Sequence, residues 1–300
     1  MVISKRLSLS PSSLGTLLVL ISAVGYGTEA IFIKLAYQSQ MSPMQVIWLR
    51  FALATLVLSP VVIRHGRSIP RSAHVVMAVI GAGLNAAVVF CLAQSLATTS
   101  ASITIVCLYL YPALVSLIAG PILGEPLTGT RVLALTISLL GVGLVSWTPG
   151  SWVISTGIVY ALAAACLNAL AIVLMKKHLS SLPGLVVSAE TLAWGAVTFS
   201  IVALAAKTRM VVPVVGVGYT IGLAIFSTVI PFATLYTALT MIEASRAVLI
   251  TTVEPVITAL LAAIFLAERM TGLQAFGGAL VLASLVLGSR SPSASRRRES

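Results

Sequence analysis

Two glutamates inside apolar stretches are the side chains in this sequence with the clearest chemical potential. Glu29 lies in the apolar run that begins at Leu14, and Glu254 directly precedes a proline in another. An ionised carboxylate is costly in apolar surroundings, so each should face a cavity, hold a partner or carry a proton. Two interpretations of Glu29 stay open. It either couples a proton or recognises a substrate ammonium, or it forms a structural pair with Lys34 or Arg50.

The residues around Glu254 predict the wall of a cavity. Thr251, Glu254 and Thr258 are spaced by three and four positions, which places them on one stripe of a helix. Pro255 lacks an N–H group and frees the carbonyl of Thr251 four residues earlier. A kinked helix with a polar stripe is typical of a cavity wall in a membrane. The alternative is a packing kink in which Glu254 binds Arg246 or a neighbouring hydroxyl.

A second proline, Pro112, predicts a matching kink earlier in the chain, where it frees the carbonyl of Leu108. Tyr109 and Tyr111 flank that point and could stack on a substrate or donate to it, or could simply pack. Amides inside membrane helices either hold helices together or contact substrate. The amides Asn85 and Asn168 are therefore candidates for the cavity, and Tyr26 is a further one.

Composition decides what kind of chain must position these residues. Hydrophobic residues make up 59% of the 300 residues and charged residues only 8%, too few to cover a soluble fold. A bilayer core needs about 20 apolar residues per helix. The sequence therefore predicts an all-α polytopic membrane protein with ten transmembrane helices, at residues 14–36, 44–64, 74–96, 100–123, 129–148, 152–176, 185–206, 215–238, 244–267 and 272–289.

The net charge of +11 is interpreted as a topology signal and not as nucleic-acid binding. With the N-terminus inside, most lysines and arginines fall in cytoplasmic loops, and only Lys207, Arg209 and Arg269 fall in outer ones. We therefore expect a bacterial-type cytoplasmic membrane with both termini cytoplasmic. The basic tail, residues 290–300, would lie near anionic lipid.

No enzyme machinery is visible in the sequence. HExxH, GxSxG and P-loop motifs are missing, and every acidic residue is Glu. Cys91, Cys107 and Cys166 lie in apolar runs without a CxxC pair, which argues against a metal site. We predict no catalytic residue, no metal and no cofactor. A channel would show a repeated filter motif or charged rings, and neither is present.

The chain contains an internal repeat. The segment that starts at Tyr111 aligns with the one at Glu254, with an offset of 143 residues that matches Pro112 to Pro255 and Glu125 to Glu268. Five helices per copy is an odd number, so the second copy enters the membrane from the opposite side. Inverted repeats place the substrate site near the midplane. The predicted organisation is an N-terminal cytoplasmic segment, two repeats and a basic tail, at residues 1–13, 14–148, 152–289 and 290–300.

The paired P-x12-E segments, each followed by Thr-Gly and a glycine-rich fifth helix, resemble the EamA family of the drug/metabolite transporter superfamily. Within it the chain looks most like exporters of the YddG type. The resemblance implies a secondary transporter that exports small metabolites, amino acids foremost, by alternating access. Efflux of drugs or of other metabolites such as nucleobases is the alternative, and a membrane-embedded enzyme or channel is the alternative of another class.

The resemblance also implies where the site lies and what the chain meets. It places the cavity among helices one, three, four, six, eight and nine, with helices two and seven outside the central bundle. The expected partners are the lipid bilayer and a small-molecule substrate, an amino acid or a similar compound. A coupling proton and the oligomeric state stay open.

Overall fold

The computed structural model describes residues 10–65, 69–124, 129–146, 155–209, 211–251 and 253–289. Within these ranges, seven helices are long and apolar enough to cross a membrane, and three shorter apolar helices fall inside predicted helices five, nine and ten. The predicted all-α polytopic fold is therefore confirmed. Glu125 and the basic tail lie outside the described residues, as do the first nine residues of the chain.

The first repeat contains the following helices in chain order. They are α1 (Pro11–Gly27), α2 (Glu29–Gln38), α3 (Pro43–His65), α4 (Arg71–Ala78), the π-helical segment η2 (Val79–Asn85), α5 (Ala86–Thr98), α6 (Ala101–Leu108), α7 (Tyr111–Leu123) and α8 (Gly129–Ser146).

The second repeat follows the same plan with fewer interruptions. Its elements are α9 (Thr156–Leu179), α10 (Gly184–Ala205), α11 (Val214–Ala224), the π-helical segment η3 (Ile225–Val229), α12 (Ile230–Met241), α13 (Ala244–Ile250), α14 (Val253–Phe265) and α15 (Gly272–Ser289).

Helices four and nine are each broken where the sequence predicts a kink. Helix four divides into α6 and α7 just before Pro112, and helix nine divides into α13 and α14 just before Pro255. A proline fits the first turn of a helix because that N–H needs no partner there. The prolines therefore start the second half of each helix. A third break, at Thr28 between α1 and α2, has no proline and was not predicted.

Helices three and eight share a different irregularity. Each carries a π-helical segment near its middle, η2 in one repeat and η3 in the other. The last residue of η2, Asn85, corresponds to Thr228 of η3 at the offset of 143 residues. Inserted π turns leave backbone groups without their usual helical partner and often mark functional positions. Both repeats thus place an irregular backbone at equivalent positions along corresponding helices.

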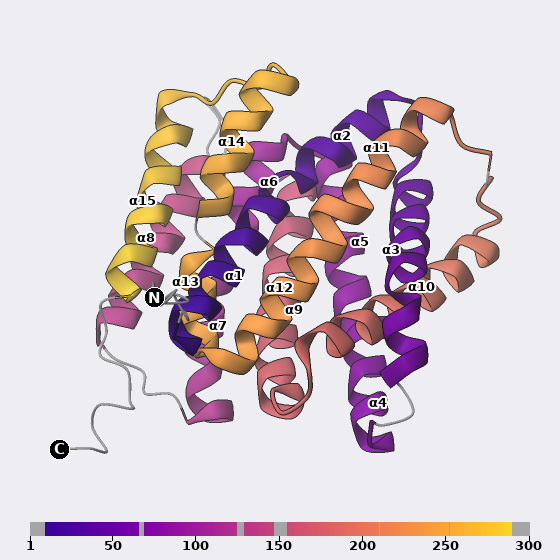
Figure 1. Cartoon of the computed structure of the whole chain (residues 1–300). Helices are drawn as coiled ribbons and strands as arrows, with labels where there is room; N and C mark the ends of the chain where they lie inside the picture. Colours follow the sequence, from indigo (N-terminus) through magenta and orange to yellow (C-terminus); the bar gives the residue numbers. More distant parts are fainter. Residues whose placement is uncertain are drawn as a thin grey trace, which may run out of the picture.

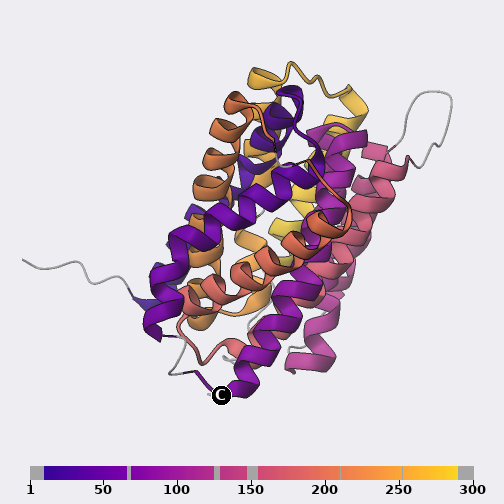
Figure 2. The same ribbon diagram turned by 90° about the vertical axis from the view of Figure 1, so that its right-hand side faces the viewer.

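The helices are arranged as a central bundle with a helix pair at either side (Figure 1). α8 packs on α15 at one edge, and α3 packs on α10 at the other. Between them, α1 contacts α12 and α5 contacts α9, so the two repeats interleave along the middle. Figure 2, turned by 90°, shows turns gathered at the two ends of the bundle. In this arrangement η2 packs on α9 and α10, and η3 contacts α1 and α3, so each irregular segment touches helices of the other repeat.

Candidate functional site: a polar pocket between the two repeats

A pocket lies in the centre of the described bundle, where the two repeats meet. Its wall combines eight polar side chains with apolar ones from the same helices. The polar side chains are Tyr26, Glu29, Arg50, Asn85, Tyr111, Asn168, Thr251 and Glu254. The apolar side chains are Val88, Val89, Leu92, Ile105, Leu108, Ile172, Phe232 and Leu235. A mostly apolar wall with a few convergent polar groups is the usual build of a small-molecule site.

The structure brings most of the sequence-predicted cavity residues to this pocket. Tyr26, Glu29, Asn85, Tyr111, Asn168, Thr251 and Glu254 line it. Tyr109 is the exception, since it is fully buried and lies behind the wall. All six helices implied by the family resemblance contribute to the wall, and helix two adds Arg50.

Tyr109 holds the break in helix nine together. Its hydroxyl donates to the Glu254 carboxylate over 2.8 Å and also contacts the Thr251 carbonyl. That carbonyl is the one Pro255 was predicted to free, and it also accepts from the Glu254 N–H at 2.9 Å. The other tyrosine of helix four contacts the same residue, because the Tyr111 hydroxyl lies 2.6 Å from the Thr251 hydroxyl. The broken helices of the two repeats are thus joined by polar contacts.

Of the two partners that the sequence allowed for Glu254, the carboxylate binds a neighbouring hydroxyl, that of Tyr109, and not Arg246. Arg246 donates instead to Ser12 at the start of α1, over 2.9 Å. Glu254 is 6% exposed and faces the pocket. Thr258, one turn further along the stripe, donates to the carbonyl of Gly27 over 3.1 Å. This contact fixes α14 against the break that follows α1.

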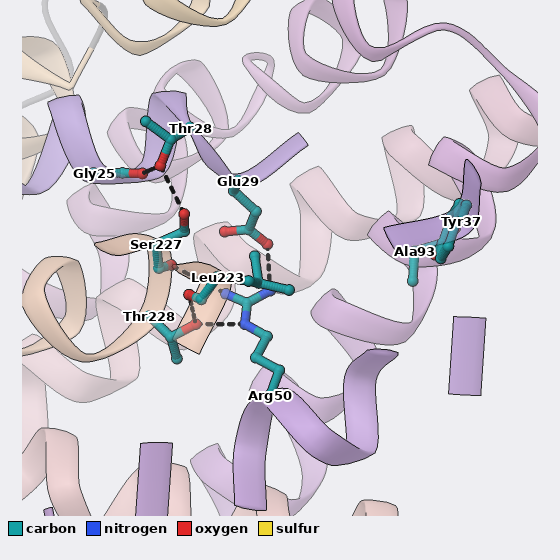
Figure 3. A network of polar contacts seen from close by, with 9 residues as sticks. All are labelled: Gly25, Thr28, Glu29, Tyr37, Arg50, Ala93, Leu223, Ser227 and Thr228. Atoms are coloured by element: carbon teal, nitrogen blue, oxygen red, sulfur yellow. Dashed lines mark hydrogen bonds and ion pairs between the residues drawn. The ribbon is translucent and has the colours of Figure 1, made fainter. Parts of the chain in front are cut away.

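Glu29 forms an ion pair with Arg50, as Figure 3 shows. The Glu29 Oε1 and Arg50 Nη1 atoms are 2.5 Å apart, and both side chains are almost fully buried. The guanidinium also donates to the Thr228 hydroxyl over 2.6 Å and to the Ser227 carbonyl over 3.2 Å. Of the two partners that the sequence allowed for Glu29, the structure has Arg50.

Lys34 binds elsewhere. Its ammonium donates to the Thr99 carbonyl over 2.8 Å and lies 3.9 Å from the Glu268 carboxylate. Glu268 accepts from the N–H of Ala101, so it caps α6 of the other repeat. These contacts lie at one end of the bundle and not in the pocket.

Aromatic and amide groups complete the pocket. Asn85 donates to the Tyr236 hydroxyl over 3.0 Å, which joins η2 to α12. The Phe232 ring stands edge-on to Tyr26, with ring centroids 6.0 Å apart. Tyr236 and Phe232 were missed by the sequence analysis, since an aromatic in an apolar helix carries no sign of which face it occupies. Arg50 was seen only as a partner for Glu29. Its position, a charge inside an apolar run, was the available signal.

A ten-segment helical bundle in two repeats, with a polar pocket between them, defines a membrane transporter of the inverted-repeat class. The profile of the EamA-like transporter family matches residues 13–147 and again residues 155–290. The chain therefore belongs to this family, whose members are transporters of small molecules.

A comparison with solved structures concerns the fold alone. A solved crystal structure of a protein resembles this chain with a TM-score of 0.71 at 21% sequence identity, over 95% of this chain and 99% of the other. A comparison with curated proteins finds no match. The similarity supports the arrangement of helices and leaves substrate to be argued from the pocket.

Proposed function

We propose that this protein is a secondary transporter that exports small metabolites, amino acids foremost, across the cytoplasmic membrane by alternating access. The observation that carries the proposal is the pocket between the repeats, which holds two carboxylates and a guanidinium in a largely apolar wall. A site at the interface of two inverted repeats can be exposed to one side and then the other as the repeats rock. No ATP-binding motif is present in the sequence, so a gradient must supply the energy.

The two carboxylates favour a substrate that carries an ammonium group. Glu29 already faces a guanidinium, whereas the Glu254 side chain accepts a hydrogen bond from the neutral hydroxyl of Tyr109. None of the ion pairs among the described residues includes Glu254. A buried carboxylate with no cationic partner is stabilised by an ammonium or by a proton. Glu254 is therefore the proposed ammonium site, and an exchange of substrate for a proton at this carboxylate would couple export to a proton gradient.

The direction and the membrane follow from the charge pattern. Basic residues concentrate in the loops that share a side with both termini, which the positive-inside rule assigns to the cytoplasm. The resemblance to YddG-type exporters supports outward transport of amino acids. A cysteine introduced among residues 296–300 tests the topology in intact cells. If a membrane-impermeant reagent labels this cysteine, the cytoplasmic location of the C-terminus is contradicted.

Transport itself is tested with purified protein in liposomes. We expect saturable counter-flow, in which vesicles loaded with an unlabelled amino acid accumulate the labelled one. Glu254→Gln should reduce this flux at least tenfold, whereas Glu243→Gln, which changes a glutamate outside the pocket wall, should not. Counter-flow of cationic drugs or nucleobases in place of amino acids would move the substrate assignment to the alternative. A linear, unsaturable flux would indicate a channel.

A further inference from the structure

Arg50 stands at a junction of both repeats. It comes from α3 of the first repeat and contacts Glu29 of the first and Ser227 and Thr228 of the second. The hydroxyls of Thr28 and Ser227 lie 2.7 Å apart, so the break after α1 and the π-helical segment η3 are joined directly beside it (Figure 3).

The guanidinium has donors left for a ligand. Arginine carries five N–H groups in a planar fork. The contacts to Thr228, Glu29 and Ser227 use one hydrogen each on Nε, Nη1 and Nη2, which leaves two without an acceptor among the described residues. Arg50 is 1% exposed overall and yet forms part of the pocket wall. Its remaining donors are therefore open to a ligand that enters the pocket.

We propose that Arg50 is the receptor for the carboxylate of a neutral, apolar amino acid, and that Glu29 occupies the guanidinium until this carboxylate displaces it. The inference deepens the proposed function and rests on it. Carboxylates bind arginine through two parallel charge-assisted hydrogen bonds, and this geometry matches the fork of Arg50.

Binding of such a substrate gives each charged group of the pocket an opposite charge to contact, while the net charge of Glu29, Glu254 and Arg50 stays at −1 because a zwitterion carries no net charge. A zwitterion brings one carboxylate and one ammonium. The carboxylate binds Arg50, and the ammonium takes a place among the two glutamates, Glu29 and Glu254. No buried charge is then left alone, which is the condition under which buried charges are tolerated. A substrate with an ammonium alone would leave Glu29 on Arg50 and gain only Glu254.

The rest of the wall selects the side chain of the substrate. Leu92, Ile105, Ile172 and Leu235 come from four different helices and surround the polar groups with apolar surface. An apolar side chain gains about 25 cal/mol for each Å² of apolar surface that it buries there. A charged side chain would lose its hydration with no partner provided, so apolar amino acids are the favoured class.

Displacement of Glu29 links the binding of substrate to a contact between the two repeats. Glu29 is the first residue of α2, directly after the break at Thr28. While it binds Arg50, it helps to fix α2 against η3 of the other repeat. Release of Glu29 loosens a contact between the repeats at the moment when the site is filled, which allows the loaded transporter to rock.

The experiment compares each amino acid with its primary amide, which keeps the ammonium and side chain and removes the carboxylate charge. Binding to purified protein is measured for L-leucine, L-valine, L-phenylalanine and L-methionine and for their amides. The variants are Arg50→Gln with Glu29→Gln, which removes both members of the pair together, and Arg64→Gln, an exposed arginine on the same helix, as the control. Monodisperse elution and an unchanged helix signal establish that each variant is folded.

We expect the wild type and Arg64→Gln to bind the acids about 10- to 100-fold more tightly than the amides, the range for a hydrogen-bonded charge. The paired variant should bind acid and amide equally. Equal binding of acid and amide by the wild type would overturn the role of Arg50, as would a preference that survives in the paired variant, while saturable flux would still uphold the transporter. Failure of all four acids to bind would overturn the inference itself, and the flux assay with other solutes would then decide the proposed function separately.

Discussion

Lys34 and Lys176 make the same contact in the two repeats. Lys34 donates to the carbonyl of Thr99, and Lys176 donates to the carbonyl of Ile242, at 2.8 and 3.1 Å. Thr99 and Ile242 follow the last residues of α5 and α12 and are themselves one repeat apart. α2 lies at the top of Figure 1 and α9 ends at its bottom, so the two contacts lie at opposite ends of the bundle. A repeat with inverted topology produces this relationship, since equivalent loops then face opposite sides.

Replacement of Lys176 by Met should lower the thermal stability of the protein. The ammonium binds the carbonyls of Leu239 and Ile242, which have no helical partner because α12 ends there. Loss of these charge-assisted bonds should cost about 1–3 kcal/mol. Lys177→Met, at the exposed neighbouring position, is the control. Thermal unfolding in detergent measures both, and equal melting temperatures would contradict the role of Lys176.

The close approach of α10 to η2 predicts a steric effect at Gly81. A Cβ atom added there would lie 2.4 Å from the backbone oxygen of Thr191, whereas one added at Gly83 meets nothing within 4 Å. Backbone cannot yield as a side-chain tip does, so we expect Gly81→Ala to destabilise the fold by about 1–3 kcal/mol. Gly83→Ala, in the same segment, should be neutral. The comparison of the two melting temperatures is the measurement, and a stable Gly81→Ala protein would show that the two helices are not in contact as described.

Tyr109 predicts a link between the broken helices and transport. Tyr109→Phe removes the hydroxyl that binds both Glu254 and the Thr251 carbonyl. A buried acceptor left without its donor costs about 1–3 kcal/mol. We expect lower stability and reduced counter-flow, because Glu254 is no longer held in place. Tyr160→Phe, on the exposed side of α9, should change neither. Unaltered flux in Tyr109→Phe would separate this hydroxyl from the site.

Much of the fold could be predicted because its signals are local. A run of about 20 apolar residues suffices to define a span, and a proline marks a helix break through its own missing N–H. Thus the break before Pro112 was visible in the sequence. The break at Thr28 and the π-helical segments were not, because they depend on contacts with other helices.

The site was predictable to the extent that its members are polar in an apolar sequence. Glu29 and Glu254 stood out for that reason. The role of Arg50 did not, since helix two was expected outside the central bundle and only the crossing of α3 past η3 brings the guanidinium to the pocket. Periodicity assigns a residue to a face of its own helix, and the packing of helices decides what that face meets.

The last prediction separates the two carboxylates of the pocket. Glu29 has a cationic partner in Arg50, whereas Glu254 is bound by a neutral hydroxyl. We therefore expect Glu29→Gln to lower the turnover of transport, because the substrate no longer releases a contact between the repeats, and to leave the dependence of flux on pH in place. Glu254→Gln should abolish that dependence, since protons then have no carboxylate at which to compete with the substrate ammonium. In the wild type the sign is fixed by this competition: acidification on the side from which substrate binds should weaken binding. The wild type and both variants are compared by the initial rates of flux in liposomes at a series of internal and external pH values.

If the pH dependence of flux disappears in Glu29→Gln and persists in Glu254→Gln, the coupling proton belongs to Glu29. If it persists in both, neither carboxylate carries the proton, and substrate moves down its own concentration difference or is driven through another group.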